Sequence, residues 1–382
     1  MAQTTCPNCG KQVYGNVKTC PYCDHTIKAA GGSKLHWNGM DFRKAMFAVI
    51  AFFVIAQFVI LCIRASKSCS RSQEKKTEQV QAGNSKDDSH DNNDQNGTFA
   101  QVTAPKLPAQ MEFCGEKINL DRIDMAERLD KELIITIYNQ AQTALIIKRA
   151  NRYFPVLIKI LKQNKIPEDI IYLAVAESAM NVGSVSTAGA AGIWQFMSST
   201  ATEYGLEVND EVDERFDIEK STVAACQFLQ KAHSQYGNWA TACASYNAGM
   251  GKISSELTDQ QERNSFDLRL VSESSRYVFR IIAYKIFLQN PKSYGYQLTS
   301  DQLYQPIDYE VVEVNAEVPS WVSWAKAHGI SYMQLRDYNP WIRNTKLTNS
   351  TGKTYKVKVP KKDALYRSKT KTTVYNKNWV ID

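Results

Sequence analysis

The sequence predicts a mainly α-helical protein flanked by small modules, and three observations support that prediction. Apolar residues recur at helical spacing between residues 124 and 296, for example at Leu133, Ile134 and Ile137. Strand-like runs are scarce in the same region. Beyond residue 306, two short strand-like runs enclose two short helical runs, which is typical of a small β-α-α-β module.

These patterns define an order of units along the chain. We expect a helical domain over residues 111–300, the β-α-α-β module over residues 307–362 and a tail over residues 363–382. The chain of 382 residues is long enough for two or three compact units, and its 43% apolar content is typical of globular proteins. The net charge of +7 comes from scattered Lys and Arg. We therefore do not expect a nucleic-acid-binding face.

Residues 1–32 carry a cysteine pattern typical of a small zinc module. Four of the nine cysteines form two Cys-x-x-Cys pairs, namely Cys6, Cys9, Cys20 and Cys23. Zinc prefers four such thiolates in a tetrahedron, and a unit this small has too little core to fold without a metal. We expect one structural zinc here, in a segment that resembles the zinc ribbons at many bacterial N-termini. A redox-active dithiol pair is the alternative.

An uncharged apolar run over residues 45–63 is interrupted only by Gln57. At about 1.5 Å per residue it nearly spans a hydrocarbon core of about 30 Å. A cleaved signal peptide is disfavoured because the run begins far from the N-terminus and no small-residue cleavage site follows it. A lipoprotein signal is excluded because Ile60 and Leu61, rather than small residues, precede Cys62. We expect a single membrane-spanning helix.

The segment over residues 64–110 is predicted to be a flexible linker. It is rich in Ser, Gln, Asn, Asp and Lys and contains almost no apolar residues. Such a segment cannot bury enough apolar surface to fold.

The densest group of candidate catalytic residues surrounds Glu177. This residue ends a strongly apolar helix predicted to start near Ile170. A carboxyl group held among apolar side chains keeps its proton to higher pH, as an acid catalyst requires. The residues alone leave an alternative open, in which Glu177 simply caps or pairs at a helix end.

Small residues over 188–192 follow Glu177 and allow a close backbone turn that could admit a bulky ligand. After this turn, Trp194 could supply a stacking face and Gln195 an amide. Two further blocks with polar residues, Ala244–Gly249 and Glu273–Val278, lie later in the chain, which makes five blocks in all. The blocks are Glu177-Ser178, Ser186, Gly192-Ile193-Trp194-Gln195-Phe196, Ala244-Ser245-Tyr246-Asn247-Ala248-Gly249 and Glu273-Ser274-Ser275-Arg276-Tyr277-Val278.

Together these blocks resemble the soluble lytic transglycosylase family, whose fold is that of goose-type lysozyme. The membrane-bound D-type branch looks nearest, because it favours Trp at the position of Trp194. The resemblance covers residues 150–296, with the order and spacing of the blocks kept. One departure is Met180-Asn181-Val182, where the family often has Phe-Asn-Pro; it concerns the wall of the cleft more than the acid.

The resemblance implies a role for each matching residue. Glu177 would protonate the glycosidic oxygen between N-acetylmuramic acid and N-acetylglucosamine, and would then accept the C6 hydroxyl proton as a 1,6-anhydro ring closes. Ser186, Gln195 and Trp194 would bind the sugar, without any catalytic cofactor. Tyr246 would hydrogen-bond near the acid.

Asn247 would line the same site. A simple helix-end turn at Gly249 is the alternative for Tyr246 and Asn247, and we favour the functional interpretation. Glu273 and Tyr277 either belong to the site or hold helices together. His233 and His328 stand without partner residues and are interpreted as structural or exposed.

The C-terminal module resembles a diverged LysM glycan-binding domain. Its helix-loop-helix pattern ends in Asn339-Pro340, as in that family. The usual Gly-Asp-Thr-Leu start is replaced by Glu317-Val318-Pro319-Ser320. Both glycan binding and a purely packing role therefore stay open.

The resemblance also predicts a location. We expect the N-terminus in the cytoplasm, the helix in the cytoplasmic membrane and the catalytic domain in the periplasm, because peptidoglycan lies outside that membrane and zinc thiolates need reducing conditions. The positive-inside rule points the other way. The flanking cations on the C-terminal side are Arg64, Lys67, Arg71, Lys75 and Lys76, against Lys34, Arg43 and Lys44 before the run.

Three other functions stay open at this point. A hydrolytic muramidase on the same fold would need a second carboxylate that positions a water molecule. A non-catalytic scaffold that binds the cell wall would not need Glu177. The zinc ribbon could instead bind a nucleic acid or an unidentified protein partner, with the rest of the chain secondary.

Overall fold

The computed structural model describes residues 3–5, 8–9, 12–14 and 104–382, and its contacts divide the chain into two units, residues 1–97 and 98–382. In the first unit, strand β1 (Gln3–Thr5) pairs antiparallel with β2 (Gln12–Tyr14). Of the predicted zinc ligands, Cys9 is described and exposed, whereas Cys6, Cys20 and Cys23 lie outside the described residues.

The apolar run over residues 45–63 and most of the predicted linker also lie outside the described residues. Among the helices of the described part, none is both long enough and apolar enough to cross a membrane. The zinc site and the membrane helix therefore stay predictions.

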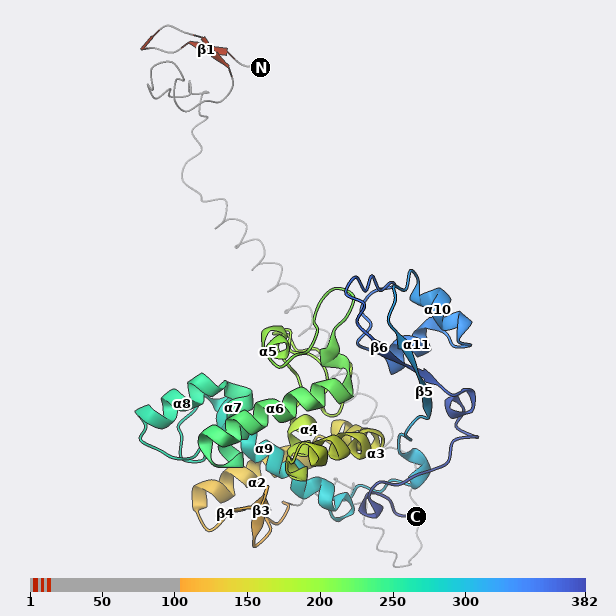
Figure 1. The fold of residues 1–382 in the computed structure, drawn as a ribbon. Coiled ribbons are helices and arrows are strands. Elements are labelled where there is room, and N and C mark those ends of the chain that lie inside the picture. Colours follow the sequence, from red (N-terminus) through yellow and green to blue (C-terminus); the bar gives the residue numbers. More distant parts are fainter. Residues whose placement is uncertain (1–2, 6–7, 10–11, 15–103) are drawn as a thin grey trace, which may run out of the picture. The chain divides into compact units, whose positions relative to one another are not determined.

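The second unit is mainly helical, as predicted, and its helices α2 to α9 gather around one core (Figure 1). Short 3-10 turns connect several of the helices, including η1 (Glu168–Ile170) and η2 (Glu214–Phe216). The helices are α2 (Ile123–Tyr138), α3 (Gln140–Gln163), α4 (Ile171–Ser178), α5 (Ser198–Glu203), α6 (Ile218–Tyr236), α7 (Trp239–Ala248), α8 (Met250–Asp259) and α9 (Ser272–Gln289).

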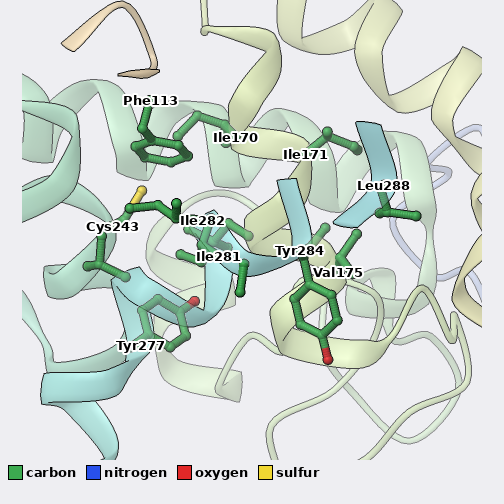
Figure 2. Close-up of a cluster of buried hydrophobic side chains, with 14 of the residues drawn as sticks. Phe113, Ile170, Ile171, Val175, Cys243, Tyr277, Ile281, Ile282, Tyr284 and Leu288 are labelled. Carbon is green, nitrogen blue, oxygen red and sulfur yellow. The ribbon is translucent and has the colours of Figure 1, made fainter. Parts of the chain in front are cut away.

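Helix α9 organises the core, because it packs against α2, α4 and α7. Figure 2 shows its residues Tyr277, Ile281 and Ile282 in one buried cluster with Ile171 and Val175 of α4. Burying an aliphatic side chain of this size stabilises the fold by roughly 1.5–3 kcal/mol. The short helix α4 is thus held in place by the core.

Two local features fix where α6 and α4 begin. Asp217 caps α6 by accepting hydrogen bonds from the backbone N–H groups of Glu219 and Lys220, both at 3.0 Å. The helix predicted to start near Ile170 is α4, which begins at Ile171 directly after the turn η1.

A hairpin that the sequence did not predict precedes the helices. Strands β3 (Met111–Phe113) and β4 (Glu116–Ile118) pair antiparallel and are too short to show a periodic pattern. Phe113 is fully buried and lies in the same cluster as Ile170 (Figure 2). The hairpin therefore covers one end of the core.

The β-α-α-β module has the predicted order of elements. Strands β5 (Tyr309–Val314) and β6 (Tyr355–Pro360) pair antiparallel and enclose α10 (Trp321–Ala327) and α11 (Tyr332–Tyr338). A second buried cluster includes Trp321 of the module together with Ala191, Val212 and Phe216 of the helical domain, so it joins the two parts.

Residues 363–382, predicted to be a tail, pack back onto the helical domain. Trp379 is 1% exposed and meets the ring of Phe154 edge-on at 5.6 Å between centroids. Its Nε1 donates to the Leu288 carbonyl at 2.6 Å. The C-terminal segment is therefore part of the helical domain's core.

Candidate active site

Helix α4 carries one carboxyl group near its end, that of Glu177. Glu177 lies in the last turn of α4, and Ala179 and Met180 directly after it adopt left-handed backbone angles, with φ of 51° and 60°. Such angles cost roughly 1–2 kcal/mol per non-glycine residue. They stop the helix one turn after the core residue Val175 and leave Glu177 at its end.

The surroundings of Glu177 favour its protonated form. Burial raises its pKa from the usual value to about 7, while the hydrogen bond from the Tyr277 hydroxyl to Glu177 Oε1 and the charge of Arg280 lower it. At neutral pH the carboxyl group is thus close to half protonated. A group in that condition can both donate and accept a proton.

Tyr277 reaches Glu177 from α9, and Tyr246 reaches the same region from the end of α7. Burial raises the pKa of both phenols, and the charge of Glu177 raises both further. Both tyrosines therefore stay neutral hydrogen-bond donors. The Tyr277 hydroxyl contacts the candidate acid. Its ring packs in the buried cluster that Figure 2 shows, so Tyr277 also holds helices together.

The loop over residues 184–196, here called the sugar loop, is fastened to α4 beside Glu177. The Ser178 hydroxyl donates to the Ile193 carbonyl at 2.9 Å. Short antiparallel bridges join Ala191 to Val185 and to Phe196. The small residues noted in the sequence thus form a tight double turn.

Ser186 and Gln195 are half-buried in the sugar loop. The Ser186 Oγ accepts from the Ala190 N–H at 3.0 Å, and Gln195 Nε2 donates to the carbonyls of Ser184 and Gly192 at 3.1 and 2.8 Å. These bonds hold both side chains in place. These bonds do not use the Ser186 hydroxyl proton or the Gln195 amide oxygen.

The predicted sugar-stacking role of Trp194 is wrong. Its side chain is 0% exposed, and its Nε1 donates to Thr222 Oγ1 at 2.8 Å. Its carbonyl accepts from the Tyr246 hydroxyl at 2.9 Å. The large apolar indole gains more by filling the core beneath the sugar loop than by facing solvent.

Asn247 is exposed at the end of α7, where its Oδ1 accepts from the Ser274 hydroxyl of α9 at 2.8 Å. The bond joins two of the motif blocks that the sequence singled out. Gly249 ends the helix with a φ of 86°, so the helix-end interpretation of this block also holds.

Sequence reasoning missed a network of charges under the site. Glu132 of α2 is 1% exposed and pairs with Arg276 Nε at 2.5 Å and Arg280 Nε at 3.6 Å. Arg280 also pairs with Glu273 at 2.8 Å. Glu132 lies next to Leu133 on the buried face of α2. A charged residue within that apolar pattern could have indicated a buried ion pair.

The expectation that His233 and His328 stand without partner residues is wrong, because each stacks on a tryptophan ring. His233 stacks on Trp239 and His328 stacks on Trp324, with ring centroids 4.1 and 3.7 Å apart.

A cavity of about 390 Å³ lies between the helical domain and the β-α-α-β module. Val182, Asp217, Trp341 and Lys358 are among its lining residues, and none of the predicted site residues is. The cavity is therefore separate from the predicted site residues.

Comparisons with known proteins assign two parts of the chain. Residues 155–268 match the family model described as the transglycosylase SLT domain. Residues 310–363 match the soluble lytic transglycosylase C-terminal LysM-like domain. The chain carries an SLT domain and a LysM-like module. Both resemblances inferred from the motifs are thus confirmed.

The relatives extend the similarity beyond the two matched segments. The chain is 29% identical over 259 residues to membrane-bound lytic murein transglycosylase D of Escherichia coli (strain K12). The match covers 66% of this chain and 56% of that protein, so the chain spans little more than half of its relative's length.

Two solved structures are also similar in part. The 70 kDa soluble lytic transglycosylase of Escherichia coli shares 21% identity, with a TM-score of 0.34, over 47% of this chain and 31% of that one. An inactive mutant of the lytic transglycosylase Slt from Pseudomonas aeruginosa shares 23%, with a TM-score of 0.32, over 44% and 28%.

Proposed function

We propose that the chain is a peptidoglycan lytic transglycosylase with Glu177 as its single acid and base. It cleaves the β-1,4 bond between N-acetylmuramic acid and N-acetylglucosamine and leaves a 1,6-anhydro-N-acetylmuramic acid end. The observation that carries this proposal is a buried carboxyl group with a pKa of about 7, held by Tyr277 at the edge of the SLT domain's sugar loop. Release of soluble fragments from purified sacculi by the purified chain tests it.

The proposed reaction uses the same carboxyl group twice. Protonated Glu177 gives its proton to the glycosidic oxygen, the bond from that oxygen to C1 of N-acetylmuramic acid breaks, and N-acetylglucosamine leaves with a free C4 hydroxyl. The Glu177 carboxylate then takes the proton of the C6 hydroxyl, whose oxygen bonds to C1. The proton returns to Glu177, and no water molecule is consumed.

The chain's other site residues support this cycle. A pKa near 7 suits both halves of it, because neither protonation state is scarce at neutral pH. Tyr277 orients the carboxyl group through its hydrogen bond. Ser186 and Gln195 bind the sugar next to the cleaved bond, Tyr246 supports the sugar loop through Trp194 O, and Asn247 lines the site. The reaction needs no cofactor.

A hydrolytic muramidase is the second candidate, and one observation favours it. The charge of Glu273 acts on Glu177, so a second carboxyl group lies near the acid. The hydrogen bond between Glu273 and Arg280 lowers the pKa of Glu273, so this second carboxyl group stays ionised. An exposed carboxylate bound to an arginine is poorly placed to position a water molecule, so we favour the transglycosylase.

We further propose that the LysM-like module binds glycan strands and that the chain is anchored in the cytoplasmic membrane through residues 45–63. The N-terminus is then cytoplasmic and the SLT domain periplasmic. A flexible linker over residues 64–110 would span on the order of 40 Å, which suits a domain that must reach the wall.

Protease added to spheroplasts is expected to remove the SLT domain and to spare residues 1–32, because only the former faces outwards in this arrangement. Immunoblots with antibodies against each end measure the outcome. Protection of the SLT domain until the membrane is lysed would show that the orientation is inverted.

We propose that Cys6, Cys9, Cys20 and Cys23 bind one structural zinc ion. The full chain in detergent is expected to contain one zinc per molecule, because four thiolates complete the tetrahedral shell. Elemental analysis measures it, with a variant that carries Ser at Cys6 and Cys9 as the control. Equal zinc in both proteins would contradict the assignment.

A further inference from the structure

One arginine also holds the sugar loop through two main-chain carbonyls. Arg215, in the turn η2, donates through Nη1 to the carbonyls of Gly189 and Phe196, at 2.9 and 3.1 Å. These two residues lie on either side of Gln195 and Gly192. The main chains also meet, because a Cβ on Gly192 would lie 1.8 Å from the Arg215 carbonyl oxygen.

The guanidinium of Arg215 is itself fixed by a carboxylate. Asp213 Oδ1 accepts from Arg215 Nε at 2.9 Å, and Asp213 Oδ2 accepts from Nη2 at 2.7 Å. The two side chains are only 11% and 7% exposed. A bidentate pair of this kind fixes the plane of the guanidinium, so the remaining nitrogen is aimed at the sugar loop.

The LysM-like module in turn holds the segment that carries this pair. The Asp213 N–H donates to the Trp341 carbonyl at 2.8 Å, and the Arg343 N–H donates to the Glu211 carbonyl at 2.8 Å. Val212 and Ile342 form an antiparallel bridge between these two bonds.

Side chains reinforce the same contact. The Arg343 guanidinium lies 4.4 Å from the centroid of the Phe216 ring. Lys353 of the module pairs with Glu207 at 2.6 Å and with Glu214 at 3.0 Å. Contacts therefore run without a break from the module, through residues 207–216, to the sugar loop.

We infer that Arg215 is a positioning residue for the proposed reaction and that the LysM-like module serves as a structural support of the sugar loop. The expected effect on kinetics rests on the proposed function. Arg215 acts through Ser186 and Gln195, whose orientation depends on the shape of the loop. Its loss should therefore weaken sugar binding while leaving the pKa of Glu177 unchanged.

The test compares two substitutions of Arg215 in the full chain. Arg215→Met removes the guanidinium. Arg215→Lys keeps a cation beside Asp213, but a single ammonium group cannot form the bidentate pair with Asp213 and also reach the two loop carbonyls. We expect both variants to lose on the order of tenfold to a hundredfold in kcat/KM on soluble glycan strands, mainly through KM. Arg215→Lys should recover most of the thermal stability that Arg215→Met loses.

Asn151→Ala is the matched control. Asn151 also donates to two main-chain carbonyls, in two distant segments, those of Tyr304 and Thr373, at 3.2 and 3.0 Å. This control should lower the melting temperature without raising KM. The inference would be overturned if Arg215→Met and the control lowered kcat/KM equally once corrected for the folded fraction, or if Arg215→Lys had a normal KM.

A second readout does not depend on catalysis. Hydrogen exchange followed by mass spectrometry should show faster exchange in peptides that cover residues 184–196 for both Arg215 variants, and not for Asn151→Ala. If the wild-type chain cut no glycan but this exchange pattern held, the proposed function would fail and the support of the loop would stand. Unchanged exchange in the Arg215 variants would contradict the inference whatever the activity.

Discussion

Glu177→Gln is expected to lower the rate of glycan cleavage on the order of a thousandfold or more. The amide keeps the shape of the side chain but can neither donate nor accept the proton that both halves of the proposed reaction need. Release of fragments from sacculi measures the loss. The matched control is Glu273→Gln, which removes a neighbouring carboxyl group and should cut at close to the normal rate.

The same variant carries a stability prediction with a definite sign. The folded-state pKa of Glu177 is raised to about 7, above its ordinary value of 4.5. Its contribution to stability is therefore present below pH 4.5 and lost as pH rises towards and through 7. Glu177→Gln should melt at a higher temperature than the wild type at pH 8, and the difference should shrink at pH 4. A less stable variant at pH 8 would contradict the burial of this group.

Gly192→Ala is expected to destabilise the sugar loop severely. The glycine has a φ of 80°, and an added Cβ would lie 1.8 Å from the Arg215 carbonyl oxygen, a main-chain atom that cannot move aside. We expect a loss of at least about 3 kcal/mol, together with loss of cleavage, because the strain of the left-handed angle adds to the clash.

Gly189→Ala separates those two causes. Gly189 has a similar φ of 84°, but nothing lies within 4 Å of an added Cβ. This control should lose only about 1–2 kcal/mol, the cost of the backbone angle. Thermal melts of both variants measure the comparison. Equal losses would mean that the contact with Arg215 does not constrain the loop.

The fold was largely predictable, because long helices repeat their apolar residues and short polar residues mark their starts. Asp217 at the start of α6 and the strands on either side of α10 and α11 are examples. The hairpin at residues 111–118 escaped prediction because three-residue strands carry no period. The packing of Trp379 against Phe154 escaped it because the two lie far apart in sequence.

The site was predictable as a set of motifs, but not as a set of contacts. Glu177 and Tyr277 lie one hundred positions apart, so their hydrogen bond depends on how α4 meets α9. Trp194 was assigned to the wrong side of its loop, since an irregular loop has no period that distinguishes buried from exposed residues. The roles of Arg215 and Glu132 depend on neighbours that only the folded chain brings together.

The chemistry of the new glycan ends tests the central claim most directly. Sacculi are digested with the purified chain in water enriched in oxygen-18, and the products are examined by mass spectrometry. If Glu177 acts alone, we expect 1,6-anhydro-N-acetylmuramic acid ends without the heavy isotope, because the C6 oxygen of the sugar itself attacks C1. Reducing ends that carry oxygen-18 would contradict that account and establish the hydrolytic alternative.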